Sequence, residues 1–145
     1  MDGFEEFVSF GQDDTFIGLV GPLYFRNLGD RTETKLVLER RHLNPNGSAH
    51  GGLLMTMMDI TLGSTAGAAI GFGGVYPTIQ LSCSFIAGAF INEELRGEAE
   101  VHRMARTIAF VSGRLRVGDR IVMTSSAVFR NPQSNSPTSV TGTPA

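Results

Sequence analysis

Residues 42–59 read HLNPNGSAHGGLLMTMMD and hold the groups of this chain most suited to chemistry. His50, Gly51 and Gly52 stand at the expected start of an apolar helix, where the first backbone N–H groups have no partner within the helix. These donors and the positive end of the helix dipole favour a developing negative charge. Glycine also lets a substrate carbonyl approach the backbone closely. The sequence therefore predicts an oxyanion site of the kind that acyl transfer requires.

Asp59 follows two turns further along the same apolar helix. A buried carboxylate without a partner is costly, so such a residue is rarely present for packing alone. It could act as a base or as a nucleophile. It could also do no more than accept hydrogen bonds from a loop. The residues by themselves leave both interpretations open.

Other polar residues of this stretch have ordinary explanations. The segment 44–47, NPNG, is typical turn chemistry before a helix. His42 and His102 lie near expected strand ends, where we expect packing or surface roles. The chain contains neither an HxxxH pair on one helix face nor a Cys/His cluster, so we expect no metal site.

Composition narrows the class of protein. A chain of 145 residues is long enough for one domain with a tail. Its 12 basic and 14 acidic residues give a net charge of -2, which argues against nucleic acid or an anionic membrane as a partner. Cys83 is the single cysteine and no secretory leader is visible, so we expect a cytoplasmic protein. Residues 51–75 have nearly the length of a membrane span, but Asp59 would cost about 3 kcal/mol there, so we expect a buried helix.

The pattern along the chain predicts an α+β fold. A short amphipathic helix is expected over residues 4–8 and a long apolar helix over 51–70. Strands are expected over residues 16–28, 34–41, 78–85, 95–103, 107–117 and 120–130, with Gly118-Asp119 as a tight turn between the last two. We therefore expect one antiparallel sheet wrapped around one central helix.

The chain divides into three expected parts: a short helix or arm over residues 1–15, the domain over 16–131, and a disordered tail over 132–145 that is rich in Ser, Thr and Pro. Gly63, Gly67 and Gly71 recur at every fourth residue of the helix. Each costs up to about 1 kcal/mol relative to alanine. Their spacing is explained if the helix closely approaches a sheet face.

Three segments of the sequence resemble the hotdog-fold acyl-CoA thioesterases, in the phenylacetyl-CoA thioesterase-like branch. They are GPLYFR (21–26), RHLNPNGSAHGGLLMTMMDITLG (41–63) and TIQLSCSFIAGA (78–89). The resemblance covers residues 16–130. Its specific element is the string HxNxxGxxHGG followed by a helical Asp eight positions after the first HGG glycine.

The resemblance implies a role for each of five residues. Asp59 would activate water or attack the thioester carbonyl. The Gly51 N–H would polarise that carbonyl, with His50 beside it. Asn44 would orient the carbonyl or the loop. Thr78 stands where related enzymes use a Ser or Thr hydroxyl to position the attacking water.

The resemblance also implies an acyl-CoA substrate and no cofactor, because hydrolysis needs only water, a base and a carbonyl polariser. Arg103, Arg106 and Arg130 are the candidates for contact with the coenzyme A arm. The acyl group itself is not decided by the sequence. Two alternatives remain: an enoyl-thioester hydratase on the same scaffold, whose usual His-plus-acid pattern we do not find, and a non-catalytic acyl-CoA-binding protein.

Helix geometry predicts how the site is assembled. Gly51 and Asp59 are about 12 Å apart along one helix, at 1.5 Å per residue. A base must come within roughly 3 Å of its proton, directly or through one water. We therefore expect a twofold homodimer, with Asn44 and Gly51 from one chain and Thr78 and Asp59 from its partner. The resemblance implies the same arrangement, and with it a dimer of dimers.

Overall fold

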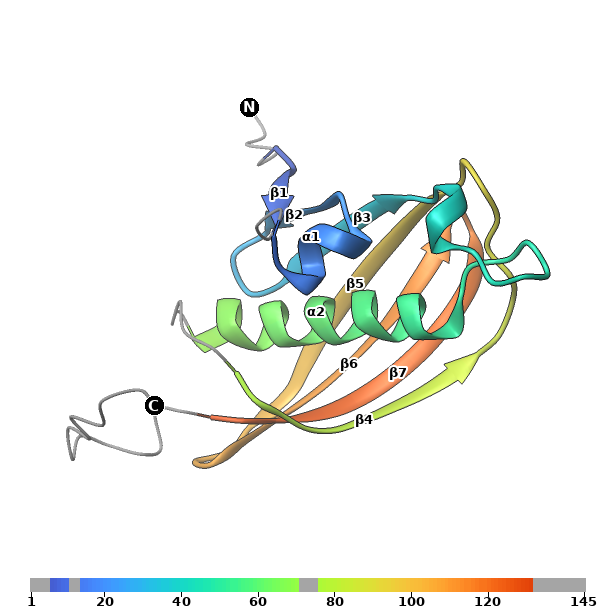
Figure 1. Cartoon of the computed structure of the whole chain (residues 1–145). Coiled ribbons are helices and arrows are strands. Elements are labelled where there is room, and N and C mark those ends of the chain that lie inside the picture. The colour runs from blue at the N-terminus through green and yellow to red at the C-terminus, as the bar shows by residue number, and fades with distance from the viewer. Residues whose placement is uncertain (1–5, 11–13, 71–75, 132–145) are drawn as a thin grey trace.

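One long helix, α2 (Gly51–Ile70), lies across one face of a twisted antiparallel sheet (Figure 1). The computed structural model describes residues 6–10, 14–70 and 76–131. Within these residues the sheet has seven strands in the order β1-β2-β3-β5-β6-β7-β4. The strands are β1 (Val8–Phe10), β2 (Leu23–Asn27), β3 (Thr32–Val37), β4 (Thr78–Phe85), β5 (Glu94–Met104), β6 (Ile108–Val117) and β7 (Arg120–Arg130). The predicted α+β architecture is confirmed.

Helix α2 and the four C-terminal strands form where the sequence predicts them, with β4 and β7 matching residue for residue. Gly118 adopts a positive φ of 55° in the turn between β6 and β7, a conformation that glycine reaches without strain. Val117 and Arg120 pair across this turn. The predicted hairpin is therefore confirmed.

The N-terminal part of the chain differs from the prediction in three places. Residues 16–28 are not one strand, because Phe16–Val20 forms the short helix α1 before β2 begins. The expected strand over 34–41 ends at Val37, and Arg40–His42 forms a 3₁₀ helix, η1. The described part of the expected helix over 4–8 is not helical, since Val8 starts β1. Contacts with distant parts of the chain hold these short segments, because β1 pairs with β2 and Arg41 and His42 bond to the end of α1.

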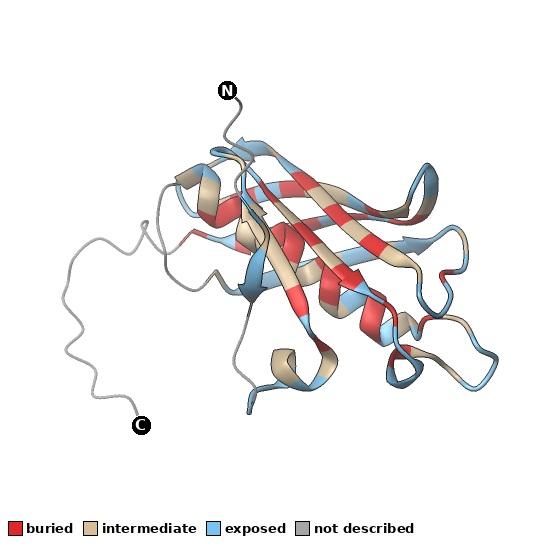
Figure 2. Ribbon diagram, turned by 90° about the horizontal axis from the view of Figure 1, so that it is seen from above, coloured by how far each residue is buried: buried red, intermediate tan, exposed pale blue. Residues whose placement is uncertain are grey.

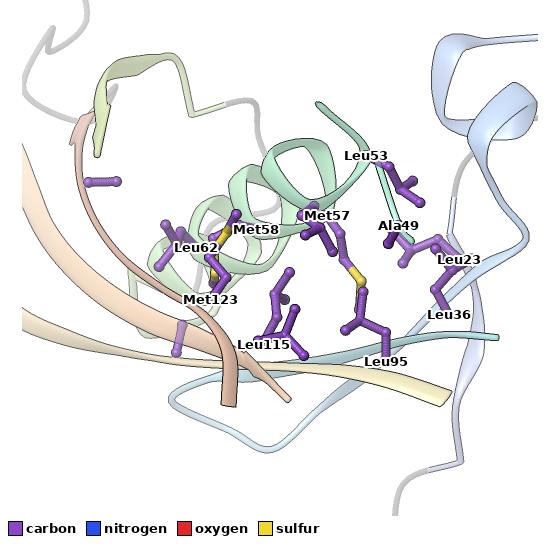
Figure 3. Close-up of a cluster of buried hydrophobic side chains, with 14 of the residues drawn as sticks. Leu23, Leu36, Ala49, Leu53, Met57, Met58, Leu62, Leu95, Leu115 and Met123 are labelled. Carbon is purple, nitrogen blue, oxygen red and sulfur yellow. The ribbon is translucent and has the colours of Figure 1, made fainter. Parts of the chain in front are cut away.

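The core lies between α2 and the sheet. Buried residues form red bands along the strands and along one side of α2 (Figure 2). Figure 3 shows side chains of α2 packed against those of the sheet. The residues of the hydrophobic core that are labelled there are Leu23, Leu36, Ala49, Leu53, Met57, Met58, Leu62, Leu95, Leu115 and Met123. Helix α2 has the length and hydropathy of a membrane span. Here that apolar character is used to cover the sheet.

Small residues bring the helix close to the sheet. A Cβ added at Gly63 would lie 3.2 Å from the ring of Phe129, so the predicted close approach is confirmed at this position. Gly67 is buried, and Gly71 lies outside the described residues. Gly97 leaves room on β5 for a buried hydrogen bond of 2.6 Å between the hydroxyls of Thr34 and Thr61.

The other face of α2, which points away from the sheet, is also mostly apolar. Its residues recur at helical spacing and are exposed or half-buried: Gly52, Met55, Thr56, Asp59 and Ile60. We call this set the outward face of α2. A helix that is hydrophobic all round is normally covered on all sides. The outward face is therefore a surface suited to a partner or a ligand.

Candidate active site

Asp59 lies on the outward face of α2 and is held by the first residue of β4. Thr78 Oγ1 donates a hydrogen bond of 2.6 Å to Asp59 Oδ1. The carboxylate is half-buried, and Thr78 is exposed. Asp59 is therefore neither fully buried nor without a hydrogen-bond partner within one chain. The second carboxylate oxygen, Oδ2, is left to contact water or substrate.

At the start of α2, the side chain of His50 acts as the N-cap. Its Nδ1 accepts a hydrogen bond of 2.8 Å from the Gly52 N–H, and its carbonyl accepts one of 3.1 Å from the Leu54 N–H. Among the described residues, none accepts a hydrogen bond from the Gly51 N–H. A Cβ at Gly51 would lie 3.3 Å from the ring of Phe85. Gly51 thus presents a donor beside an aromatic ring, in the place where the sequence predicted an oxyanion site.

Asn44 orders the loop that leads to this helix. Its Oδ1 accepts from the N–H groups of Asn46 and Ser48 at 2.9 and 3.2 Å, and its Nδ2 donates to Ser48 Oγ at 2.9 Å. The same loop is closed by a bridge between Leu43 and Ala49. The Asn44 amide is thus occupied within the loop. Of the two roles that the resemblance implies, this geometry fits orientation of the loop.

The structure brings Thr78 to Asp59 but keeps Gly51 away from it. Helix α2 is continuous over both residues, so Gly51 and Asp59 are separated by about 12 Å along its axis. A single thioester carbon cannot contact both groups at hydrogen-bonding distance. One chain therefore supplies each half of the predicted constellation, but not a complete site.

The three predicted arginines are exposed and lie at one end of the sheet. Arg103 is the residue before the last one of β5, Arg106 is in the following turn, and Arg130 ends β7. The Arg130 N–H donates a hydrogen bond of 2.9 Å to the carbonyl of Pro77, the residue before Thr78. The end of the sheet that carries these cations is therefore the end at which β4 begins. Nearby, burial raises the pKa of Tyr76 above its ordinary value.

Sequence reasoning missed the wall that faces Asp59. A cavity of about 420 Å³ lies between α1 and the outward face of α2, and it is lined by Phe16, Ile17, Met55, Thr56, Asp59 and Ile60. The prediction had placed Phe16 and Ile17 on a strand. Two signals favoured a helix: Thr15, whose side chain caps α1 by accepting from the Gly18 N–H at 3.4 Å, and Pro22 shortly after its end.

Comparison with known proteins identifies the family to which the chain belongs. The profile of the Thioesterase superfamily matches residues 46–124, more than half of the chain. "Putative esterase PA0474" of Pseudomonas aeruginosa is 32% identical over 133 residues, which are 88% of this chain and 96% of that protein. The chain belongs to the thioesterase superfamily.

Solved structures agree with this assignment. The conserved protein PA5202 of Pseudomonas aeruginosa has a TM-score of 0.75 at 29% identity, covering 81% of this chain and 93% of that chain. A phenylacetic acid degradation-related protein of Ralstonia eutropha, described as a putative thioesterase, has a TM-score of 0.72 at 26% identity and covers 83% of this chain and 92% of its own. The fold is the hotdog fold, and the predicted resemblance is confirmed.

Proposed function

We propose that this protein hydrolyses acyl-CoA thioesters to the free acid and coenzyme A. The observation that carries the proposal is the Asp59 carboxylate, which is held at Oδ1 by Thr78 and borders an apolar cavity on the outward face of α2. A carboxylate beside an acyl-binding space can act as the base or nucleophile of thioester hydrolysis, and membership of the thioesterase superfamily supports that chemistry. The non-catalytic alternative gives no reason to fix a carboxylate at this position.

Asp59 can promote the reaction by either of two routes. As a base, Oδ2 takes a proton from water while the water oxygen attacks the thioester carbonyl carbon. As a nucleophile, Oδ2 attacks that carbon itself, and water then cleaves the resulting anhydride. Both routes break the carbon–sulfur bond, and the thiolate leaves as coenzyme A after gaining a proton. The Thr78 hydroxyl orients the carboxylate in both cases.

The Gly51 N–H is the group that we propose to polarise the thioester carbonyl. Negative charge develops on the carbonyl oxygen as the tetrahedral intermediate forms, and a preorganised N–H donor at a helix N-terminus stabilises it. The His50 side chain occupies the Gly52 N–H, which leaves the Gly51 donor for the substrate. Asn44 keeps the preceding loop in the required conformation.

We propose that a second copy of the chain completes the site. Because Gly51 and Asp59 are about 12 Å apart on one helix, two antiparallel α2 helices related by a twofold axis would place each Gly51 near the other chain's Asp59. Two surfaces support this dimer. The outward face of α2 is apolar, and β4 is an edge strand with large exposed apolar side chains at Ile79 and Phe85.

We place the coenzyme A arm near the end of the sheet that carries Arg103, Arg106 and Arg130. Cations suit the phosphates of coenzyme A, and this end of the sheet adjoins Thr78. The arm would then run from the surface toward the Asp59 carboxylate.

Thiol release from a panel of acyl-CoA thioesters tests the proposal. The purified protein should release coenzyme A from at least one apolar acyl thioester, and Asp59→Asn should abolish most of that release. If acyl-CoA thioesters bind tightly but no thiol appears with any of them, the enzyme assignment is wrong and the binding protein replaces it.

A further inference from the structure

The α1 helix is anchored to the loop that carries the HxNxxGxxHGG motif. A helix of five residues is far too short to be stable alone. The carbonyl groups of its last turn also lack partners within the helix. Its end is therefore held by other parts of the chain, and those contacts decide where α1 lies.

Two consecutive side chains of η1 hold these carbonyls. Arg41 Nη1 donates to the Leu19 carbonyl at 2.9 Å, and Arg41 Nη2 donates to the Gly21 carbonyl. His42 Nε2 donates to the Val20 carbonyl at 2.6 Å. A cation is favoured at the C-terminal end of a helix, because that end carries partial negative charge. We call Arg41 and His42 the latch of α1.

His42 also connects the latch to the start of α2. Its ring is buried, with 3% exposure, and Nδ1 accepts a hydrogen bond of 2.9 Å from the Glu39 N–H. The ring proton is therefore on Nε2, where it serves α1. The His42 carbonyl accepts a hydrogen bond of 2.9 Å from the His50 N–H. His42 thus holds both the end of α1 and the residue that precedes Gly51.

The latched helix faces the carboxylate across the cavity of about 420 Å³. The cavity is open to solvent on one side, and its volume in a single chain lies within the range of small-ligand sites, about 300–1,000 Å³. Phe16 and Ile17 form one wall, while Met55 and Ile60 of α2 form the other. Among the described residues that line the cavity, Asp59 is the charged one, and none carries a positive charge. The lining suits an uncharged apolar group and disfavours a second carboxylate.

We propose that α1, held by the latch, is the wall that selects the acyl group, and that the substrates are thioesters of uncharged apolar acids. This inference rests on the proposed thioesterase function and names the substrate class of that site. Phe16 and Ile17 are its specificity-determining residues. Arg41 and His42 are positioning residues that act through α1 without touching the substrate.

A series of straight-chain acyl-CoA thioesters, from acetyl to palmitoyl, tests the wall. Each methylene that enters the cavity should raise kcat/KM about fourfold, until the cavity is full and the increase stops. Phe16→Ala should move that break toward longer chains, and Ile17→Trp should move it toward shorter ones. Leu19→Ala is the matched control, because this side chain is on the same helix, is exposed, and does not line the cavity. Thioesters with a terminal carboxylate should be poor substrates at every length.

The latch is tested by Arg41→Met, which removes both guanidinium bonds to α1. The KM for long chains should rise more than the KM for acetyl-CoA, so that the dependence on chain length becomes flatter. A residue with only a general structural role would lower activity equally at all lengths. An equal loss at all lengths would overturn the positioning role.

Calorimetric titration with S-alkyl-CoA thioethers, which cannot be hydrolysed, separates this inference from the proposed function. Suppose that no thiol is released, but that thioether affinity rises with chain length and is altered by Phe16→Ala. The acyl-selecting role of α1 is then established, and the thioesterase function is wrong. If thiol is released equally at all chain lengths, and neither Phe16→Ala nor Ile17→Trp alters this profile, the acyl-selecting role of α1 is wrong and the thioesterase function stands.

Discussion

The hydroxyl of Thr78 donates a 2.6 Å hydrogen bond to the carboxylate of Asp59, and so joins the first residue of β4 to the middle of α2. This contact holds Oδ1 of a residue that lines the cavity beside α1. The two residues thus form one half of the proposed site. The other half, at Gly51 and Asn44, lies at the beginning of the same helix.

Replacement of Asp59 tests the reactive group. Asp59→Asn keeps the size of the side chain and its capacity to contact Thr78, but it removes the base or nucleophile. We expect turnover to fall by about 10²–10⁴-fold, the usual contribution of such a group. Steady-state thiol release measures the loss, and circular dichroism checks the fold. A folded variant with turnover near that of the parent protein would exclude Asp59 from the reaction.

Replacement of Thr78 tests the positioning of that carboxylate. Thr78→Val keeps the shape but loses the hydroxyl, whose hydrogen bond to a charged group is worth about 1.5–3 kcal/mol. We expect kcat to fall at least about tenfold, with a smaller change in KM. Thr78→Ser retains the donor and should restore most of the loss. Equal activity of the Val and Ser variants would show that the contact does not matter for turnover.

Heterodimers test whether the site is shared between chains. Asn44→Ala and Asp59→Ala should each be weakly active alone. Co-expressed with two different affinity tags, they should form heterodimers in which one site carries neither defect, and this site should recover about half of the parent activity. A heterodimer of Asp59→Ala with the parent chain is the control. Verified mixed dimers that are no more active than the two variants alone would place both groups in one chain.

Replacement of Arg130 tests the proposed position of the coenzyme A arm. An exposed ion pair is worth about 0.2–1 kcal/mol, so Arg130→Ala should raise the KM for an acyl-CoA thioester by up to about fivefold. The effect should weaken as the ionic strength increases. The matching acyl-pantetheine thioester lacks the nucleotide phosphates and should show no such increase. An equal change for both substrates would mean that Arg130 does not contact the nucleotide.

Glu93 provides a prediction for stability against pH. Its hydrogen bond with the Arg120 side chain, together with one from the Phe90 N–H, lowers the pKa of Glu93 below its ordinary value of 4.5. Because the pKa is depressed in the folded state, this stabilisation is complete above 4.5 and is lost as the pH falls through the folded-state pKa.

The urea midpoint of the parent protein should therefore decrease more steeply in this acid range than that of Glu93→Gln. Arg120→Met removes the main partner and should reduce the difference. Parallel pH profiles for the parent and Glu93→Gln would contradict the assigned pairing.

The sequence alone determined the elements with strong local signals. The apolar run of α2 is long enough to exclude a strand, and the alternation in β4 matches the two-residue period of a sheet. The motif from His42 to Asp59 also identified the candidate groups, because an unusual residue in an apolar helix is visible without coordinates. Those groups were therefore predicted with their correct helix, strand and loop.

Only the tertiary structure decided what surrounds those groups. The apolar run from Phe16 to Val20 could be helix or strand, and its end is fixed by Arg41 and His42, about twenty residues further along the chain. The periodicity of α2 could not show which face carries Asp59 outward, because both faces are apolar. Contact with the sheet decided this, by burying Met57, Met58 and Leu62 and leaving the carboxylate on the opposite side, beside Thr78.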